Sequence, residues 1–348
     1  MPDGELISVT INDGIKKFSE LGRHDNSNDD KSKYKKVCVG DIAYNSMRMW
    51  QGASGCSPYE GIVSPAYTVL TPNSGINSKC MAYQFKLPAT IHTFKINSQG
   101  ITSDNWNLKF PALSEIEIYV SHYEQEQAKI AAYFANLDHL ITLHQRKYDK
   151  LQVLKKAMLE KMFPKNGSSV PEIRFKGFTD AWEQRKLGAL CVEFKSGDFI
   201  SASDIAENEA YPVYGGNGLR GFTNHYNHDG EYALIGRQGA LCGNVNYAVG
   251  KSYFTEHAVA VRANKTNQTR FLYYLFSTMN LGPYSGQSAQ PGLAVGNLVE
   301  LENVVPSKPE QEKIASFLSS LDNLITLHQR ELEKLQNIKK SMLEKMFV

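Results

Sequence analysis

A glycine-rich stretch is the first candidate for chemistry, because such loops can hold phosphate groups. Gly216, Gly218 and Gly221 match the G-x-G-x-x-G pattern that cradles a dinucleotide where a strand leads into a helix. Residues 222–227, which follow, are typical of a turn and not of a helix. The stretch therefore disfavours nucleotide binding.

Acidic and histidine residues are the second candidates. Asp180 with Glu193 and Lys195 resembles a nuclease set, and His225 and His228 could bind a metal ion. Carboxylates near a lysine and histidines in polar loops are, however, common on ordinary surfaces. The sequence also lacks a nucleophile elbow and the Asn/Asp-Pro-Pro-aromatic string that holds an extruded adenine. We therefore expect neither a catalytic site nor a metal site in this chain.

Polar loops in both halves of the chain carry side chains that can read the base edges of double-stranded DNA. Arginine can fork onto guanine, asparagine or glutamine onto adenine, and lysine contacts phosphates. Any single polar residue in a glycine-rich turn is more often just part of the turn, but the set recurs in both halves and favours a binding surface. The candidate DNA-contacting residues are Lys33, Lys35, Lys36, Asn45, Arg48, Trp50, Gln51, Asn217, Arg220, Asn224, Arg237, Gln238, Ser288 and Gln290.

The chain contains an internal sequence repeat, and the elements that it encodes must position these loops. Residues 126–163 and 310–347 align without a gap at a constant offset of 184 residues, and they share 25 identities in 38 positions. The period is far too long for a solenoid unit. The chain therefore contains two large modules, each ending in the same segment.

The repeated segment is predicted to be a long helix. It contains no internal Pro or Gly, and its apolar residues recur in alternating steps of four and three over nearly five heptads. Ser307 and Glu310 have the spacing of a capping box at the start of the second copy, and Pro164 follows the first. Two matching apolar seams in one chain most simply pack against each other.

Polar residues recur at the same register of both seams. His144 and His328, like Lys155 and Lys339, interrupt the apolar pattern, and such residues often set register or orientation. Histidines at such positions are more often packed, neutral side chains than metal ligands or catalytic groups. The matched H-Q-R-x-x-x-x-K-L-Q faces could instead bind two copies of a partner. The candidate partner-binding residues are His144, Arg146, Lys150, His328, Arg330 and Lys334.

The segments before the two helices are predicted to be mixed α/β globules. Runs such as Ile118–Val120 and Tyr232–Ile235 predict short strands, and Thr269–Ser277 predicts an amphipathic helix. The fold class is therefore α+β, with each mixed α/β globule followed by a long helix. The predicted boundaries are 1–123 and 172–307 for the globules, 124–163 and 308–348 for the helices, and 164–171 for a linker.

The composition excludes several classes of protein. A chain of 348 residues with 42% hydrophobic and 21% charged residues is ordinary globular sequence, long enough for two domains. The net charge of +2 argues against a purely electrostatic nucleic-acid binder, so a partner would supply part of the grip on DNA. Five cysteines without a C-x-x-C pair, and no apolar run long enough for a membrane span, favour a cytoplasmic protein.

The chain resembles the specificity subunits of type I restriction-modification systems. The repeated helical segments carry the resemblance, together with V-P-E-I-R-F-K-G-F at 170–178 and W-E-Q-R-K-L-G at 182–188. Supporting strings are G-D-I-A-Y at 40–44, Y-P-V-Y-G-G-N-G at 211–218 and S-A-Q-P-G-L at 288–293. The resemblance covers essentially the whole chain.

This resemblance implies two target-recognition domains and two conserved helices that pair as an antiparallel coiled coil. Each recognition domain would read one half of a bipartite DNA site, and the helices would fix the spacer. Two methyltransferase (modification) subunits would dock along the helices, and restriction/translocase subunits would complete the complex. The chain itself would be non-catalytic and without a cofactor, with S-adenosylmethionine, ATP and Mg on the partner subunits.

One departure from the family's pattern affects the first domain. The string W-E-Q-R-K-L-G occurs only once, at 182–188, whereas family members usually begin with their own copy. We therefore expect the recognition domain at 1–123 to be short at its amino-terminal side. Two alternative functions stay open: a stand-alone DNA nuclease or modification enzyme, and a coiled-coil scaffold with no role on DNA.

Overall fold

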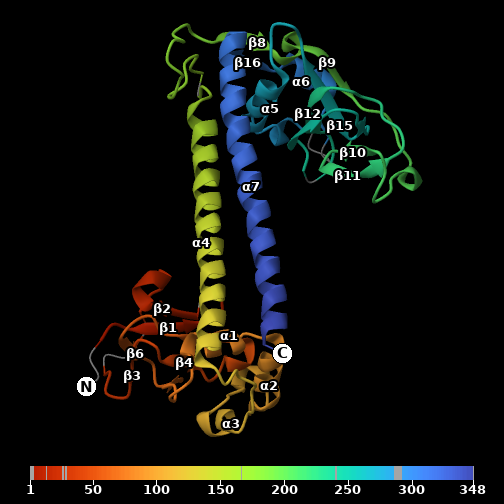
Figure 1. Ribbon diagram of the computed structural model, residues 1–348. Helices are drawn as coiled ribbons and strands as arrows, with labels where there is room; N and C mark the ends of the chain where they lie inside the picture. Colours follow the sequence, from red (N-terminus) through yellow and green to blue (C-terminus); the bar gives the residue numbers. More distant parts are fainter. Residues whose placement is uncertain are drawn as a thin grey trace. The chain divides into compact units, whose positions relative to one another are not determined.

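The computed structural model describes residues 4–12, 14–25, 27, 30–165, 167–239, 241–285 and 292–347. The chain divides into two compact units (Figure 1). Unit 1 consists of Met1–Arg146 and Gln329–Val348, and unit 2 of Lys147–His328. Because the division falls within both long helices, each unit contains a globule together with part of each helix.

Unit 1 is built from short strands and helices around the start of a long helix. Its sheets have the strand orders β5-β4-β7, β1-β2 and β3-β6. The elements in chain order are β1 (Ile7–Thr10), β2 (Gly14–Lys17), β3 (Lys35–Val37), β4 (Ile42–Asn45), β5 (Ser54–Cys56), β6 (Gly61–Val63), β7 (Tyr67–Leu70), α1 (Ser78–Gln84), α2 (Pro88–Ile96), α3 (Phe110–Ser114) and α4 (Glu124–Lys161), which continues into unit 2.

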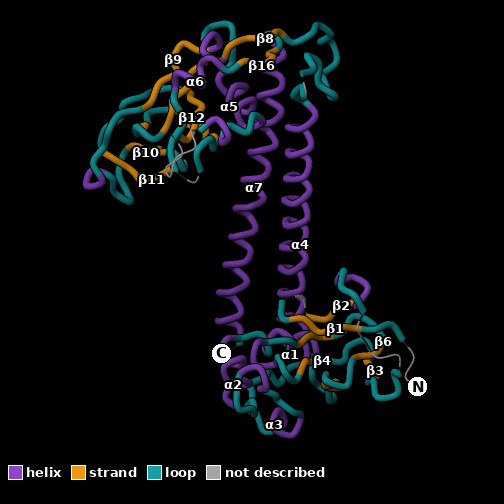
Figure 2. Tube along the Cα trace, turned by 180° about the vertical axis from the view of Figure 1, so that it is seen from behind, coloured by secondary structure: helices purple, strands orange, loops and turns teal. Residues whose placement is uncertain are grey.

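Unit 2 has a larger sheet of order β13-β12-β15-β9, with smaller sheets β11-β10-β14 and β16-β8. Helix α5 packs between the four-stranded sheet and α7, and Figure 2 shows these elements from behind. The elements in chain order are β8 (Glu183–Lys186), β9 (Cys191–Ser196), β10 (Tyr211–Gly215), β11 (Gly218–Thr223), β12 (Glu231–Gly236), β13 (Val245–Val249), β14 (Tyr253–Phe254), β15 (Ala258–Ala263), α5 (Thr269–Thr278), α6 (Val295–Glu300), β16 (Glu302–Val305) and α7 (Lys308–Met346), which ends in unit 1.

Two of the three local predictions are confirmed. The strand predicted at Tyr232–Ile235 lies within β12, and the helix predicted at Thr269–Ser277 is α5. The strand predicted at Ile118–Val120 is wrong, because this stretch forms no ladder with any described residue. Its counterpart 184 residues later is β16, which pairs with β8. An alternating pattern becomes a strand only when a partner strand lies beside it.

The two long helices run antiparallel within each unit, and the predicted coiled coil is confirmed. In unit 1 the Phe134 ring stacks on Phe347 at 6.0 Å, and Lys339 Nζ lies 2.6 Å from Asp138 Oδ1. The repeat-related ion pair in unit 2 joins Lys155 Nζ and Asp322 Oδ1 at 2.5 Å. The two lysines thus pair with aspartates at matching positions of the opposite helix, which fixes the register.

The start of α7 agrees with the capping signal, but the predicted capping box is wrong. Ser307 directly precedes the helix, and its carbonyl accepts a hydrogen bond of 3.0 Å from the Glu310 backbone N–H. The Glu310 carboxylate instead binds the Arg174 guanidinium at 2.7 and 2.8 Å. A bidentate pair with arginine is stronger than a bond to one backbone N–H.

Replacing Lys155 by alanine should lower the free energy of unfolding by roughly 0.5–1 kcal/mol. The effect is small because the side chains of Lys155 and Asp322 are 23% and 31% exposed, so water screens the pair. Urea unfolding of Lys155→Ala, Asp322→Ala and the double variant would measure the coupling energy. The exposed neighbour Lys156→Ala is the control, and a coupling energy of zero would contradict the role in register.

Candidate nucleic-acid interface

A pocket of about 470 Å³ in unit 2 brings together three of the predicted DNA-contacting residues. The β10–β11 hairpin supplies Asn217 and Arg220, and the turn after β12 supplies Gln238. Gly216, Gly239 and His257 complete the lining. An amide pair and a guanidinium in one open pocket offer both donors and acceptors, which is what a base edge requires.

The glycines of the G-x-G-x-x-G stretch serve the backbone of this hairpin. Gly218 has a φ of +96°, and a Cβ on Gly221 would lie 2.6 Å from Ile205 Cγ2. The stretch links two antiparallel strands, β10 and β11, and not a strand to a helix. The prediction that no helix follows this stretch is therefore confirmed.

His257 is a pocket residue that sequence reasoning missed. It comes from the turn between β14 and β15, and its Nε2 lies 3.2 Å from Glu256 Oε1. No local pattern marks it, because only the parallel pairing of β10 with β14 brings this turn beside the hairpin. It adds a group that can donate or accept a hydrogen bond at the pocket wall.

The other predicted residues of unit 2 lie outside the lining of this pocket. The Arg237 Nε donates to the Leu293 carbonyl at 3.2 Å and its Nη1 to Ser196 Oγ at 3.3 Å, which ties three segments of the unit together. Asn224 is exposed in the turn after β11, where its Oδ1 lies 2.9 Å from His225 Nδ1. Ser288 and Gln290 fall outside the described residues.

In unit 1 four predicted residues share the turn that follows β4, which corresponds to the turn after β12. Asn45 Oδ1 accepts from the Met47 N–H at 3.1 Å, and Trp50 Nε1 donates to the Met47 carbonyl at 3.1 Å. Arg48 Nη1 donates to Gln51 Oε1 at 3.2 Å, with both side chains at the surface. Asn45 and Trp50 thus shape the turn, which leaves Arg48 and Gln51 as its better placed DNA candidates.

The predicted lysine run lies beside this sheet. Lys33 and Lys36 are exposed, whereas Lys35 Nζ donates to the backbone carbonyls of Pro65 at 3.2 Å and Tyr67 at 2.5 Å. All three lysines therefore lie at the surface, as phosphate contacts would, and Lys35 also holds the loop before β7.

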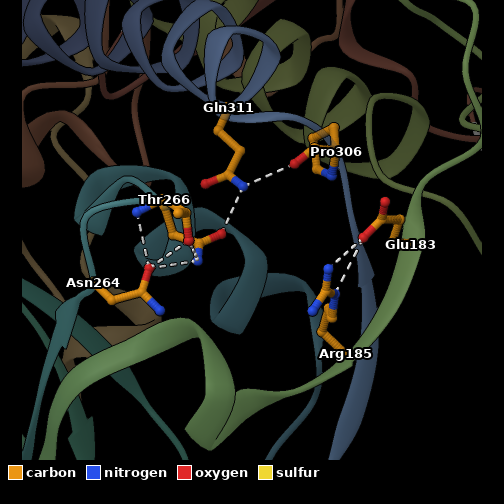
Figure 3. Close-up of polar contacts among 7 residues, drawn as sticks. Glu183, Arg185, Asn264, Thr266, Pro306 and Gln311 are labelled. Atoms are coloured by element: carbon orange, nitrogen blue, oxygen red, sulfur yellow. Dashed lines mark hydrogen bonds and ion pairs between the residues drawn. The ribbon is translucent and has the colours of Figure 1, made fainter.

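A buried glutamine joins each globule to its long helix. In unit 2 Gln311, only 1% exposed, accepts from the Gln268 N–H at 3.0 Å. Its Nε2 donates to Asn267 Oδ1 at 2.8 Å and to the Pro306 carbonyl at 2.9 Å, and Figure 3 shows the bond to Pro306. Figure 3 also shows the Asn264 side chain, whose Oδ1 accepts from Thr266 and orders the same loop. Every polar atom of the Gln311 amide group therefore has a partner, as burial requires.

The same arrangement recurs in unit 1. Gln127, 2% exposed, accepts from the Asn77 N–H at 2.8 Å and donates to the carbonyls of Gly75 and Ser121 at 3.1 and 2.8 Å. Both amides thus hold the N-cap residue of the first helix that follows the sheet, Asn77 for α1 and Gln268 for α5. The identity of Gln127 and Gln311 across the repeat was the signal that sequence reasoning did not use.

A tyrosine–aspartate bond completes each junction. Tyr274 Oη donates to Asp322 Oδ2 at 2.7 Å, and Tyr83 Oη donates to Asp138 Oδ2 at 2.8 Å. Burial, followed by the hydrogen bond to the aspartate, raises the pKa of both tyrosines well above the usual range. Each phenol is therefore a permanent donor that ties its globule to the helix.

The repeated helices also line a pair of matching grooves. The groove in unit 2 has a volume of about 530 Å³ and the groove in unit 1 about 600 Å³. Five repeat-related positions line both, and they are Gln152/Gln336, Lys155/Lys339, Lys156/Lys340, Leu159/Leu343 and Glu160/Glu344. The same five residue types, one glutamine, two lysines, one leucine and one glutamate, are thus presented twice.

None of the predicted partner-binding residues lines these two grooves. His144 and His328 are partly buried on their helices, whereas the other four, Arg146, Lys150, Arg330 and Lys334, are exposed. The helices therefore present two candidate partner surfaces, the predicted helix faces and the repeat-related grooves.

A polar network surrounds the carboxylate that resembled part of a nuclease set. Glu193 accepts from Tyr232 Oη at 2.9 Å and lies 3.1 Å from Lys195 Nζ and 3.2 Å from His228 Nε2. Burial alone would raise the pKa of Glu193, but the hydrogen bonds from Lys195 and Tyr232 outweigh it and lower the pKa. Across the described part of the chain, no three His, Cys, Asp or Glu side chains gather into a group that could hold a metal ion.

Acidification should destabilise unit 2 through His228. Burial, the largest influence, lowers the pKa of His228 from its ordinary 6.5. Because the unfolded chain takes up the proton first, the stability from this group is full above pH ~6.5 and declines as the pH falls through the folded pKa. Urea unfolding at a neutral and a mildly acidic pH should show a smaller decline for His228→Gln than for the natural chain.

The exposed His225→Gln is the matched control for this pH effect. It should show the same decline as the natural chain, since it lies outside the network of Glu193. An equal decline in His228→Gln would show that the pH dependence arises elsewhere.

The repeated modules and their paired helices define a known class of protein. The sequence profile of the type I restriction modification DNA specificity domain matches residues 14–153 and 179–337. The chain therefore belongs to this family. Within the described residues, no helix has both the length and the apolar character needed to cross a membrane.

Individual relatives agree with this assignment. The chain is 44% identical over 146 residues to the Type I restriction enzyme EcoprrI specificity subunit of Escherichia coli, a match that covers 41% of this chain and 36% of that protein. It is 24% identical over 363 residues to the putative type I restriction enzyme MjaX specificity subunit of Methanocaldococcus jannaschii, covering 96% and 84% of the two chains. The fold matches the type I restriction-modification S subunit from M. genitalium with a TM-score of 0.70 at 19% identity, covering 100% and 90%.

Proposed function

We propose that the chain is the non-catalytic DNA-specificity subunit of a type I restriction-modification complex, and that each unit reads one half of a bipartite double-stranded site. The observation that carries the proposal is the pocket of unit 2, where Asn217, Arg220 and Gln238 converge. The curated relatives, which are named as specificity subunits of type I restriction enzymes, support it. In unit 1 the turn with Arg48 and Gln51 takes the corresponding place.

The partners are two methyltransferase subunits, joined by restriction/translocase subunits. The two repeat-related grooves support this number, because one groove chemistry presented twice fits two copies of one partner. S-adenosylmethionine, ATP and Mg belong to those subunits, and the complex works in the cytoplasm. The partner also supplies part of the affinity for DNA, since a net charge of +2 is too small for strong electrostatic binding by this chain alone.

Methylome sequencing tests the function directly. A host that expresses this chain with its methyltransferase subunit should acquire methylation at one bipartite sequence, and a host with either subunit alone should not. Cleavage of DNA by the purified chain with a divalent metal would support a stand-alone nuclease instead. An absence of any DNA binding even with the methyltransferase present would support a scaffold.

Charge reversal in the grooves should change the number of methyltransferase subunits bound. We expect Lys156→Glu or Lys340→Glu to reduce the complex from two methyltransferase subunits to one, and the double variant to reduce it to none. Each reversal places a carboxylate beside the glutamate that lines the same groove. Mass measurement of the purified complex gives the stoichiometry.

Lys150→Glu and Lys334→Glu are the matched variants on the predicted helix faces. If these two remove the methyltransferase while the groove variants leave it bound, the predicted faces are the docking surface and the grooves are not. Circular dichroism would confirm that all four variants keep their helices.

A further inference from the structure

One continuous segment of unit 2, residues 174–196, covers three separate groups of residues in that unit: a buried carboxylate, strand β16 and strand β15. Arg174 forms the bidentate pair with Glu310, whose side chain is only 1% exposed. Strand β8 then pairs with β16, with Glu183 opposite Val305 and Lys186 opposite Glu302. Finally, β9 pairs with β15 and so covers the side of β15 that would otherwise be the edge of the sheet. Between the strands, Leu187 and Leu190 enter the core at 0% and 3% exposure.

The first two of these surfaces are uncovered in unit 1. Glu126, the repeat counterpart of Glu310, is exposed, and its carboxylate accepts a hydrogen bond from Ser121 Oγ but has no arginine partner among the described residues. The counterpart of β16 is 118–121, where Tyr119 is 90% exposed and Val120 38%. The backbone N–H groups of 118–120 form no backbone hydrogen bond with a described residue. The Tyr119 carbonyl accepts from the buried Gln84 side chain, but the stretch has no partner strand among the described residues.

The third surface is the edge of the central sheet. In unit 1 the order is β5-β4-β7, so β7 pairs with β4 and is the last strand on that side. All four residues of β7 are half-buried, whereas Ala258–Val261 of β15, which β9 covers, are 0% exposed. At the Tyr67 end of β7 the backbone groups are already bonded, the carbonyl to Lys35 Nζ and the N–H to the Ser64 carbonyl. The rest of the strand is an edge with partly exposed apolar side chains, which is a template for another strand.

We propose that unit 1 binds an extended polypeptide with the chemistry of residues 174–196 along Glu126, the stretch 118–121 and the open edge of β7. The occupant carries an arginine for the Glu126 carboxylate, a tryptophan eight residues later and two short strands joined by a leucine-rich turn. The internal repeat supports this occupant, because in unit 2 a segment of this kind occupies the repeat-related surfaces. Strand addition of this kind gains affinity from backbone hydrogen bonds and specificity from the side-chain pockets. It is independent of DNA reading.

A synthetic peptide tests the proposal on the full chain. The peptide has the sequence of residues 171–197 with Cys191→Ser, and its binding to the full chain is measured by fluorescence anisotropy. We expect saturable binding of one peptide per chain, because the equivalent place in unit 2 holds its own segment. Hydrogen exchange should slow at 118–121 and at Tyr67–Leu70 on binding, and should stay unchanged at β16 and β15.

A charge exchange makes the test specific. Glu126→Arg in the chain should weaken binding of the natural peptide by roughly tenfold or more, and a peptide with Arg174→Glu should recover it. The control is Glu124→Arg, an equally exposed glutamate in the same helical turn, which should leave the affinity unchanged. The proposal is overturned if the peptide does not bind, if Glu126→Arg has no effect, or if the peptide protects β16 and β15 of unit 2 as much as unit 1.

Discussion

Arg174→Ala is expected to lower the free energy of unfolding of unit 2 by about 3 kcal/mol, at the lower end of the range for breaking a buried ion pair. The Glu310 carboxylate is 1% exposed and would lose both of its bonds to the guanidinium, while Arg174 itself is 13% exposed. The hydrogen bond to Glu310 also raises the pKa of Arg174, so the guanidinium stays charged at every physiological pH. Urea unfolding followed by tryptophan fluorescence would report on Trp182, which lies in the same segment.

Arg185→Ala is the matched control for this loss. Figure 3 shows the ion pair of Arg185 with Glu183. The two groups lie 2.6 Å apart, but their side chains are 57% and 69% exposed, so the change should be within ~0.5 kcal/mol. A loss for Arg174→Ala as small as that for Arg185→Ala would mean that Glu310 gains water or another partner when the arginine is removed.

Arg220→Ala is expected to relax recognition of one half of the DNA site by about 1–3 kcal/mol while the other half is read as before. Arg220 lines the unit 2 pocket with Asn217 and Gln238, and a bidentate arginine contact contributes most of the discrimination at a guanine. Methylome sequencing with the variant would show methylated sites that are degenerate at positions within a single half-site.

Variants at two other arginines make this prediction specific. Arg48→Ala in unit 1 should relax the opposite half-site, because it occupies the corresponding turn. Arg237→Ala should instead lower stability, since its guanidinium holds Leu293 and Ser196. A uniform loss of methylation at all sites with Arg220→Ala would identify that residue as a phosphate contact or a structural group.

The long helices could be predicted almost to the residue, because their signal is local. The apolar steps of four and three placed the helices at 124–163 and 308–348, and α4 and α7 span Glu124–Lys161 and Lys308–Met346. Strands were predicted less well, since a strand depends on a partner that is distant in sequence. Tyr232–Ile235 has such partners in β13 and β15, whereas Ile118–Val120 has none among the described residues.

The candidate site could be predicted by residue type but not by role. Asn217, Arg220 and Gln238 were identified because their side chains suit base edges, and the fold brings them to one pocket. His257 was missed, because only the pairing of β10 with β14 brings its turn to the pocket. Arg237 is an arginine like Arg220 and directly precedes Gln238, yet its hydrogen bonds are made to Leu293 and Ser196 within the unit. No sequence pattern distinguishes such a structural arginine from one that could contact DNA.

The buried glutamines have a consequence for how such a protein can change its specificity over evolution. Gln127 and Gln311 each need only three hydrogen-bond partners from the globule and its loops. These are a loop carbonyl, a second acceptor and the backbone N–H of one N-cap residue. Asp138 and Asp322 add the need for one tyrosine. A globule that meets these few conditions can replace another on the same helix without any change in the helix. Selection on the proposed DNA-reading loops is thereby separated from selection on the helices, so the loops can diverge while the helices are retained.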